Sequence, residues 1–175
     1  MNRNSFLISF LCCVVIGVFA SGSRAVMKGL STEELTKSAD TVIIGEVADV
    51  QAQWSKDGSS IFTIATIDVS QVVRGQTLPA RISVEYEGGE VGDIGLRVSD
   101  VGTLEKGEKV LLFLKTAKSK KDGSAYTMVG KSQGTYRIGA DGIASKSGFS
   151  VMDGQDAIES NIPLSDLVKK IRSIR

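Results

Sequence analysis

The stretch TVIIGEVADVQAQW, residues 41–54, decides the fold because its apolar side chains change sides partway along it. In the first half the small or apolar residues fall on odd positions, at Ile43, Gly45 and Val47. After Val47 they fall on even positions and end at Trp54. Successive side chains of a strand point to opposite faces, so a parity change beside a glycine predicts a bulge or sharp bend. A long strand bent in this way can serve two sides of a small barrel.

The segments that follow also have strand patterns. SKDG at 55–58 predicts a hairpin turn, because Asp-Gly supplies the positive φ angles that such turns need. Residues 60–73 are predicted to form the second strand of this hairpin. RISVEYE at 81–87 alternates, which predicts a buried apolar face and a solvated face that carries both glutamates. The glycine-rich residues 88–108 are expected to be irregular, and the apolar run VLLFL at 110–114 predicts a strand covered on both faces.

Two short helices are expected to flank the strands. STEELTKS at 31–38 opens with a capping box, in which Ser31 can cap the Glu34 amide and Glu34 can reach back to Ser31. PLSDLVKKIRSI at 163–174 has Pro163 at a helix start, followed by an apolar stripe at helical spacing.

Further strands complete the predicted domain. Residues 125–130 and 134–138 are expected to pair as short strands, and Asp141-Gly142 predicts another tight turn. Many strands with glycine-rich turns indicate a mainly β chain. The bent strand and the hairpin after it favour a small OB-like five-stranded barrel with a short N-terminal helix and a C-terminal amphipathic helix. A β-sandwich is the alternative. We expect one domain over residues 26–175.

The N-terminal segment has the pattern of an export signal. Arg3 precedes FLISFLCCVVIGVFA, an uncharged run from Phe6 to Ala20 that is shorter than the about twenty apolar residues of a membrane span. A basic start, a short apolar run and small residues after it predict a cleavable signal peptide over residues 1–25. Cleavage after Ala20 and cleavage after Ala25 both fit the small-residue rule, and an uncleaved anchor is the alternative. The mature protein is expected to be secreted or periplasmic, with no stable membrane span.

Composition excludes several kinds of chemistry. The 175 residues include no His, and both cysteines, Cys12 and Cys13, lie in the predicted signal peptide. A Ser-His-Asp triad, a Cys-His nucleophile and an imidazole metal site are therefore excluded. The 21 basic and 20 acidic residues nearly balance, so we expect no nucleic acid partner. Any metal held by the mature chain would need oxygen ligands alone, as Ca²⁺ and Mg²⁺ accept, and no cofactor is expected.

The acidic, glycine-rich stretch EYEGGEVGDIGLRVSD, residues 85–100, is the predicted partner-binding loop. Glu87, Glu90 and Asp93 recur every third residue, and Arg97 follows at a distance that lets it pair with one of them. Binding residues are commonly carried on loops that a rigid scaffold holds at the surface. Clustered oxygens can instead hold Ca²⁺, although this spacing is not that of an EF-hand. Two carboxylates about 5–10 Å apart in a cleft can also hydrolyse glycosidic bonds.

Trp54 is the only tryptophan. It continues the apolar parity of its strand and is expected in the core, with a rim position that contacts a ligand as the alternative. Lys115, Lys118, Lys120 and Lys121 form a basic run, which is expected to be a solvated hairpin loop.

An ordered set of segments over residues 39–139 carries a resemblance to a known family. They are ADTVIIGEVADVQAQW (39–54), TIDVSQVVRG (66–75), ISVEYEGG (82–89), KGEKVLLFLK (106–115) and GKSQGTYRIG (130–139). This order resembles bacterial secreted proteins with a netrin-like, or tissue-inhibitor-of-metalloproteinase-like, OB barrel. The resemblance implies an extracellular binding or inhibitory module. Animal inhibitors of this fold are stapled by disulfides and present an N-terminal cysteine to a protease zinc, a route that a mature chain without cysteine does not have.

These features predict an exported, non-enzymatic binding module with a protein partner. A secreted peptidase is the partner class to test first, by analogy with the family that the chain resembles. The alternatives are a carboxylate-dependent hydrolase built on residues 85–100 and a purely structural envelope component.

Overall fold

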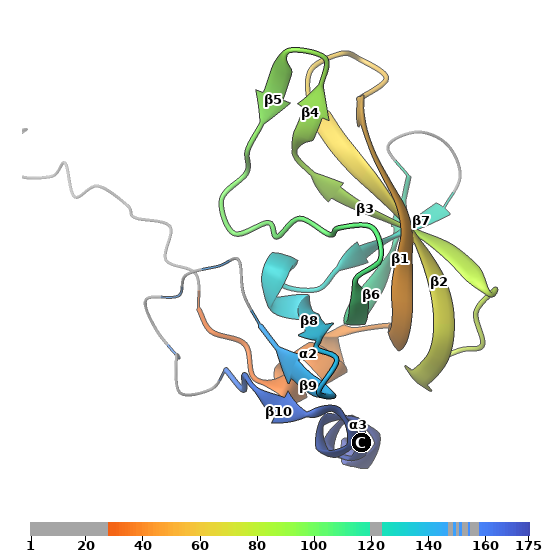
Figure 1. Cartoon of the computed structure of the whole chain (residues 1–175), viewed down its shortest axis with the longest axis vertical. Coiled ribbons are helices and arrows are strands. Elements are labelled where there is room, and N and C mark those ends of the chain that lie inside the picture. The colour runs from red at the N-terminus through yellow and green to blue at the C-terminus, as the bar shows by residue number, and fades with distance from the viewer. Residues whose placement is uncertain (1–27, 120–123, 147–148, 150, 152–153, 155–157) are drawn as a thin grey trace, which may run out of the picture.

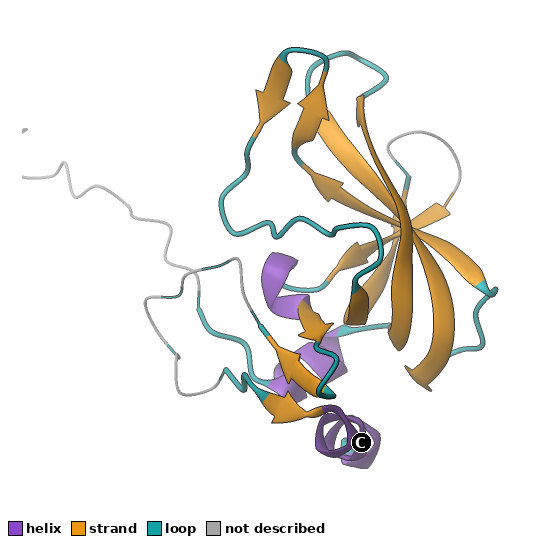
Figure 2. Ribbon diagram, in the orientation of Figure 1, coloured by secondary structure: helices purple, strands orange, loops and turns teal. Residues whose placement is uncertain are grey.

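The computed structural model describes residues 28–119, 124–146, 149, 151, 154 and 158–175. In these residues the chain forms a strand barrel, with a smaller group of strands and helices packed at one end of it (Figures 1 and 2). The predicted signal peptide, residues 1–25, lies outside the described residues.

Five strands form the barrel. They are β1 (Thr41–Trp54), β2 (Ile61–Arg74), β3 (Arg81–Glu87), β6 (Lys109–Lys118) and β7 (Ser124–Met128). They hydrogen-bond in the order β1-β2-β3-β7-β6, and the ring closes where β6 pairs with β1. The neighbours are antiparallel except β3 and β7, which are parallel. The ring confirms the predicted OB-like five-stranded barrel and not the alternative β-sandwich.

The bend predicted in β1 is present. The register between β1 and β2 shifts at three places: between Val42 and Ile43, between Ile44 and Gly45, and between Val47 and Asp49. Gly45 lies where the two backbones come close, because a β-carbon there would be 2.6 Å from the carbonyl oxygen of Asp68. Before the last of these shifts β1 pairs with both β6 and β2, and after it with β2. The parity change in the sequence therefore marks the point where β1 changes its pairing.

Two apolar cores lie on opposite sides of the barrel wall. The first fills the barrel and contains the buried residues Ile43, Val47, Ala65, Ile67, Ile82, Val84, Tyr86, Leu104, Val110, Leu112 and Leu114. The second lies outside the wall and contains Leu35, Val42, Val73, Leu111, Phe113, Val129, Tyr136, Ala144, Leu167 and Ile171. β6 contributes alternate residues to both cores, which confirms the prediction that the apolar run 110–114 is covered on both faces.

Helices and short strands cover the second core. The elements are α2 (Thr32–Ser38), α3 (Leu164–Ser173), β8 (Thr135–Ile138), β9 (Ile143–Ser145) and β10 (Ile162–Pro163). The predicted capping box begins α2: the Glu34 amide donates to Ser31 Oγ at 3.2 Å, and the Ser31 amide donates to Glu34 Oε2 at 2.9 Å. In α3 the apolar stripe buries Leu167 and Ile171. Neither helix in the described part of the chain is long and apolar enough to cross a membrane.

Some local expectations were wrong. β7 pairs with β3 and β6, while β8 pairs with β6 and β9, so residues 125–130 and 134–138 do not pair with each other. The 3-10 helix η1 (Lys131–Gly134) separates them. Residues 88–108 are not wholly irregular, because β4 (Gly89–Val91) and β5 (Ile94–Leu96) form a small hairpin. Glu85 is not on a solvated face: it is only 5% exposed, and the hydroxyl of Ser119 donates to its carboxylate.

Replacing Gly45 with alanine should lower the free energy of unfolding by about 1–3 kcal/mol, a usual cost of overpacking. The new β-carbon would meet Ile67 Cγ2 at 2.7 Å and the carbonyl oxygen of Asp68 at 2.6 Å. Gly95→Ala is the matched control, since its β-carbon would contact only the flexible side chain of Glu90, at 3.3 Å. Denaturant unfolding measures both variants, and a Gly45→Ala protein as stable as the wild type would contradict the close approach at the bend.

Candidate functional site

The predicted partner-binding residues lie on and beside the β4–β5 hairpin, which projects from one end of the barrel (Figure 1). Glu87 ends β3, Glu90 lies in β4, Asp93 lies in the turn between β4 and β5, and Arg97 follows β5; all four are exposed. Among the described residues, Arg97 makes no ion pair with Glu90 or Asp93. No group of three or more His, Cys, Asp or Glu side chains in that part of the chain could hold a metal. The hairpin thus spreads these acids out and does not gather them around a cation.

Two large apolar side chains are exposed at this end of the molecule. Trp54, the last residue of β1, is 42% exposed, and Ile94, the first residue of β5, is 55% exposed. A β-carbon on Gly89 would lie 2.7 Å from Ala52 Cβ, and Val91 shares that face of β4. Ile94 is the register partner of Val91, so it lies on the same face of the hairpin as Val91. The core position expected for Trp54 is wrong, because β1 extends beyond the filled barrel before it reaches Trp54.

A pocket of about 230 Å³ opens at the seam between the parallel strands β3 and β7. These strands share a single register pair, Val84 with Tyr126. Beyond this pair they separate, and the pocket lies between Glu85–Glu87 on β3 and Thr127–Met128 on β7. Glu87 therefore belongs both to the pocket and to the predicted partner-binding loop.

The pocket wall formed by the segment after β5 is tied to the barrel. Ser132 donates from its amide and its hydroxyl to the Asp100 carbonyl, at 3.1 and 2.7 Å. The Leu104 amide donates to the Tyr86 hydroxyl at 3.2 Å. Asp100 and Lys131 both have left-handed φ angles, 62° and 57°, which residues other than glycine rarely adopt. Such conformations persist only where the surroundings hold them, so this wall is preformed.

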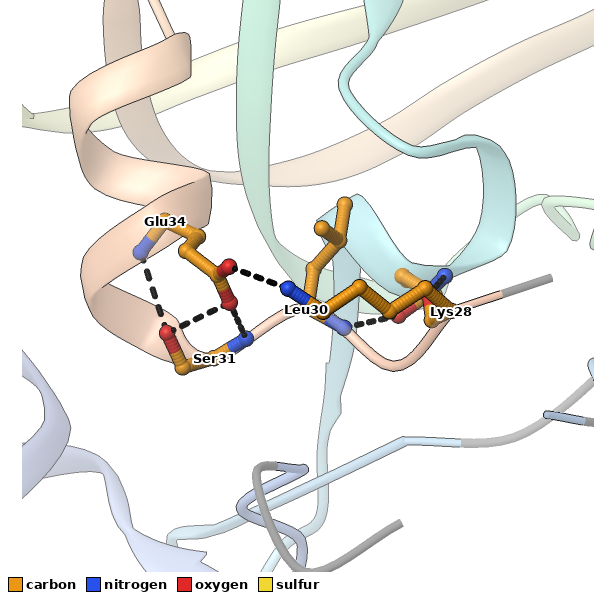
Figure 3. Close-up of polar contacts among 5 residues, drawn as sticks. Lys28, Leu30, Ser31 and Glu34 are labelled. Atoms are coloured by element: carbon orange, nitrogen blue, oxygen red, sulfur yellow. Dashed lines mark hydrogen bonds and ion pairs between the residues drawn. The ribbon is translucent and has the colours of Figure 1, made fainter. Parts of the chain in front are cut away.

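The segment before α2 is anchored by the side-chain amide of Gln133, which is 1% exposed. The amide oxygen accepts from the Leu30 N–H at 2.7 Å, and the amide nitrogen donates to the Lys28 carbonyl at 3.0 Å. The Gln133 side chain thus bonds to this segment as the backbone of a paired strand would, with one donor and one acceptor. Figure 3 shows Lys28 and Leu30 beside the capping box of α2. A β-carbon on Gly29 would collide with the carbonyl oxygen of Gly154, so the segment before α2 also packs closely against the backbone at Gly154.

A polar cluster beside this anchor contains Lys146. Its ammonium group donates to the Gln133 carbonyl at 2.6 Å and lies 4.5 Å from the centre of the Tyr136 ring. The Tyr136 hydroxyl shares a hydrogen bond of 3.2 Å with the hydroxyl of Thr32. Burial lowers the pKa of Lys146 to about 8 and raises the pKa of Tyr136 to about 12. The cluster connects α2, η1 and β8, so its role is to hold these elements together.

A scan of the chain against protein-family models finds no match, and a search of the curated proteins finds no significant relative. The hairpin acids are evident in the sequence, whereas the burial of Glu85, the role of Gln133 and the pocket are not. No local pattern predicts the pocket, because it forms where two strands far apart in the sequence separate.

Replacing Gln133 with alanine should lower the free energy of unfolding by about 1–3 kcal/mol, the usual cost of leaving backbone groups without partners. Hydrogen exchange at the Leu30 amide should become faster, since its acceptor is gone. The exposed Gln76 supplies the control variant Gln76→Ala, which should change neither measurement. Unchanged exchange at Leu30 in Gln133→Ala would show that the amide does not hold the segment.

Lys146 should make stability depend on pH. Its folded pKa lies below its unfolded value of 10.5, so between about pH 8 and 10 the unfolded chain binds a proton that the folded chain does not. The contribution of Lys146 to the free energy of unfolding therefore rises with pH across that range. From pH 8 to pH 10, the free energy of unfolding of the wild type should rise by about 1–2 kcal/mol more than that of Lys146→Met. Denaturant unfolding at both pH values measures the gain, with the exposed Lys169→Met as control; equal pH dependence in the wild type and Lys146→Met would disprove it.

Proposed function

We propose that this protein is an exported, non-enzymatic binding module that takes a protein partner at the end of the barrel that carries the β4–β5 hairpin. The observation that carries the proposal is the exposure of Trp54 and Ile94, the two large apolar side chains exposed among the described residues. Grouped apolar side chains on a soluble surface commonly mark interaction sites, and tryptophan is enriched among the residues that dominate binding energy.

The charges around this apolar pair suit a protein interface. Glu87, Glu90 and Asp93 are exposed along the same hairpin and the strand that leads into it. Protein interfaces commonly combine an apolar centre with a polar rim. An acidic rim favours a partner with basic residues at its edge, because complementary charges speed association and suppress wrong partners.

The hairpin is also held firmly to the barrel. The Gly88 amide donates to the Ile61 carbonyl at 3.0 Å, and the hydroxyl of Thr63 donates to the Gly88 carbonyl at 2.6 Å. Because these bonds fix the base of the hairpin, little conformational freedom is lost when a partner binds.

The other parts of the proposal come from the sequence. Export follows from the signal pattern in residues 1–25, and a non-enzymatic role from the absence of His and of any cysteine after Cys13. The spread of Glu87, Glu90 and Asp93 along an exposed hairpin gives the hydrolase alternative no support, since that chemistry needs two carboxylates held in a cleft. A secreted peptidase stays the first partner class to test, by analogy with the netrin-like family that the chain resembles.

Replacing Trp54 and Ile94 together with serine should reduce partner binding at least tenfold, because both apolar anchors are lost. The exported protein carries a photo-crosslinker and is incubated with the extracellular and envelope fractions of its native host, and the crosslinked proteins are quantified. Lys37→Ser with Lys169→Ser, two exposed positions on the helices, is the matched control. Equal crosslinking by the wild type and the Trp54/Ile94 variant would contradict the proposed surface, and no specific crosslink in either would favour the structural envelope role.

A further inference from the structure

We propose that the free edge of β5 binds an extended segment of the protein partner, which adds to the β4–β5 hairpin as a third strand and carries a basic residue beside Gly95. The source of this segment rests on the proposed function. The pairing chemistry of the edge follows from the backbone of the hairpin, and it can be tested with short peptides.

Strand β5 has a neighbouring strand on one side only. Among the residues that the structure describes, β5 pairs with β4 and with no other strand. Figure 1 shows β5 on the outer side of the hairpin, with β4 nearer to the barrel. Ile94 and Gly95 are exposed, and so is Arg97, which follows the strand. An uncovered strand edge offers its N–H and C=O groups to another chain.

The register of the hairpin decides which backbone groups face outward. The turn after β4 has two residues and begins with Gly92 at a φ of 61°, so the flanking pair of Val91 and Ile94 is the hydrogen-bonded one. Hydrogen-bonded and non-hydrogen-bonded pairs alternate along an antiparallel ladder. The N–H and C=O groups of Gly95, in the next pair, therefore point away from β4.

The next residue, Leu96, follows this alternation. A β-carbon on Gly88 would lie 2.8 Å from the Leu96 carbonyl oxygen, so this carbonyl faces inward. The backbone of Gly95, by contrast, has no hydrogen-bond partner in the described part of the chain. Gly95 therefore supplies one free donor and one free acceptor to an added strand.

Glu90 supplies the preference for a basic residue. It is the register partner of Gly95, and a β-carbon on Gly95 would lie 3.3 Å from Glu90 Cγ and 3.8 Å from its Oε1. The Glu90 side chain thus lies over Gly95, which has no side chain to separate it from an added strand. Glu90 is exposed and forms no ion pair within residues 28–119, 124–146 and 158–175. A lysine or arginine beside Gly95 can reach across the glycine to this carboxylate, since opposite charges on one face of a sheet attract.

The other face of the hairpin is apolar. Val91, Ile94 and Leu96 share this face, because register partners and residues two apart point the same way. The residues that flank the basic one in an added strand would lie beside Ile94 and Leu96 and would cover Ile94, which is 55% exposed. The expected partner segment therefore alternates apolar and polar residues, with the basic residue at its centre.

Arg97 defines the rival ligand. It lies two positions beyond Gly95, where it would attract an acidic residue. Arg97 follows the end of β5, whereas Glu90 is held inside β4 by strand pairing. Glu90 and Asp93 also outnumber it on the hairpin. A segment centred on an acidic residue is the opposite assignment, and the experiment includes it.

The test titrates the exported protein with peptides, followed by NMR chemical shifts and by hydrogen exchange at the Gly95 amide. The probe is acetyl-Val-Thr-Val-Lys-Val-Thr-Val-amide, whose sequence reads the same in both directions and so fits either strand orientation. It should bind about threefold more tightly than the peptide with a central glutamine and about tenfold more tightly than the one with a central glutamate. At saturation it should slow exchange at the Gly95 amide at least tenfold.

Two pairs of protein variants test the backbone and the charge. Gly95→Pro removes the outward N–H and should lower the affinity for the lysine peptide at least tenfold, since proline is tolerated at a strand edge but cannot donate there. Gly95→Ala keeps the N–H and is its matched control. Glu90→Gln should remove the preference for lysine over glutamine, and the exposed Glu105→Gln should keep it.

A set of modified peptides tests strand pairing without changing the protein, so the proposal stays testable if Gly95→Pro does not fold. One peptide is N-methylated at its valine amides and the other at its lysine and threonine amides. Methylation of one set should abolish binding and methylation of the other should spare it, because alternate amides of an added strand face β5.

Several results would overturn the proposal. Full binding by both methylated peptides or by Gly95→Pro would show that the backbone edge is not used. Tighter binding of the glutamate peptide, lost in Arg97→Gln, would reverse the charge assignment. Protection of the Gly95 amide that rises with protein concentration, together with dimer formation in sedimentation, would assign the edge to a second copy of this chain.

The same variants separate this inference from the proposed function. If the Trp54/Ile94 variant loses the partner while Gly95→Pro keeps it at full affinity, the binding surface stands and strand addition is wrong. If the lysine peptide binds at β5 but no partner is crosslinked, the chemistry of the edge stands and the proposed function fails.

Discussion

The close approach of β1 and β2 at Gly45 is the constraint on which the rest of the structure depends. It lets one strand pair with β6 before the bend and continue along β2 beyond it, so the ring of five strands closes. Any β-carbon at this position would meet backbone as well as side-chain atoms, and backbone cannot move aside cheaply. Closure then places β7 between β6 and β3, where it must run parallel to β3.

The features that bear on function lie where this regular pairing stops. β3 and β7 share one register pair and then separate, which leaves the pocket beside Glu85. At the end of the barrel, β1 extends past the filled interior and exposes Trp54, and the β4–β5 hairpin exposes Ile94. A closed barrel has few free strand edges, so irregular places such as these are where it can present side chains to a partner.

The second core explains how the rest of the chain is held without disulfides in the expected mature protein. β6 buries side chains on both of its faces, and α2 and α3 cover the outer one. The anchor at Gln133 then holds the segment before α2 through two hydrogen bonds to its backbone. Lys146 lies beside this anchor, and its burial disfavours the charged ammonium form. The stability of this part of the fold is therefore expected to depend on pH.

The sequence by itself determined the elements whose signals are local. The bounds of β1 and β3, the bulge at Gly45 and the capping box at Ser31 all follow from neighbouring residues, because parity and capping act over a few positions. Only the tertiary structure decided which strands β7 and β8 join, that Trp54 is exposed, and that Glu85 is buried beside a pocket. Each of these depends on what covers a residue from a distant part of the chain. An alternating strand pattern shows which residues share a face of the strand. It does not show which segment of the chain will cover that face.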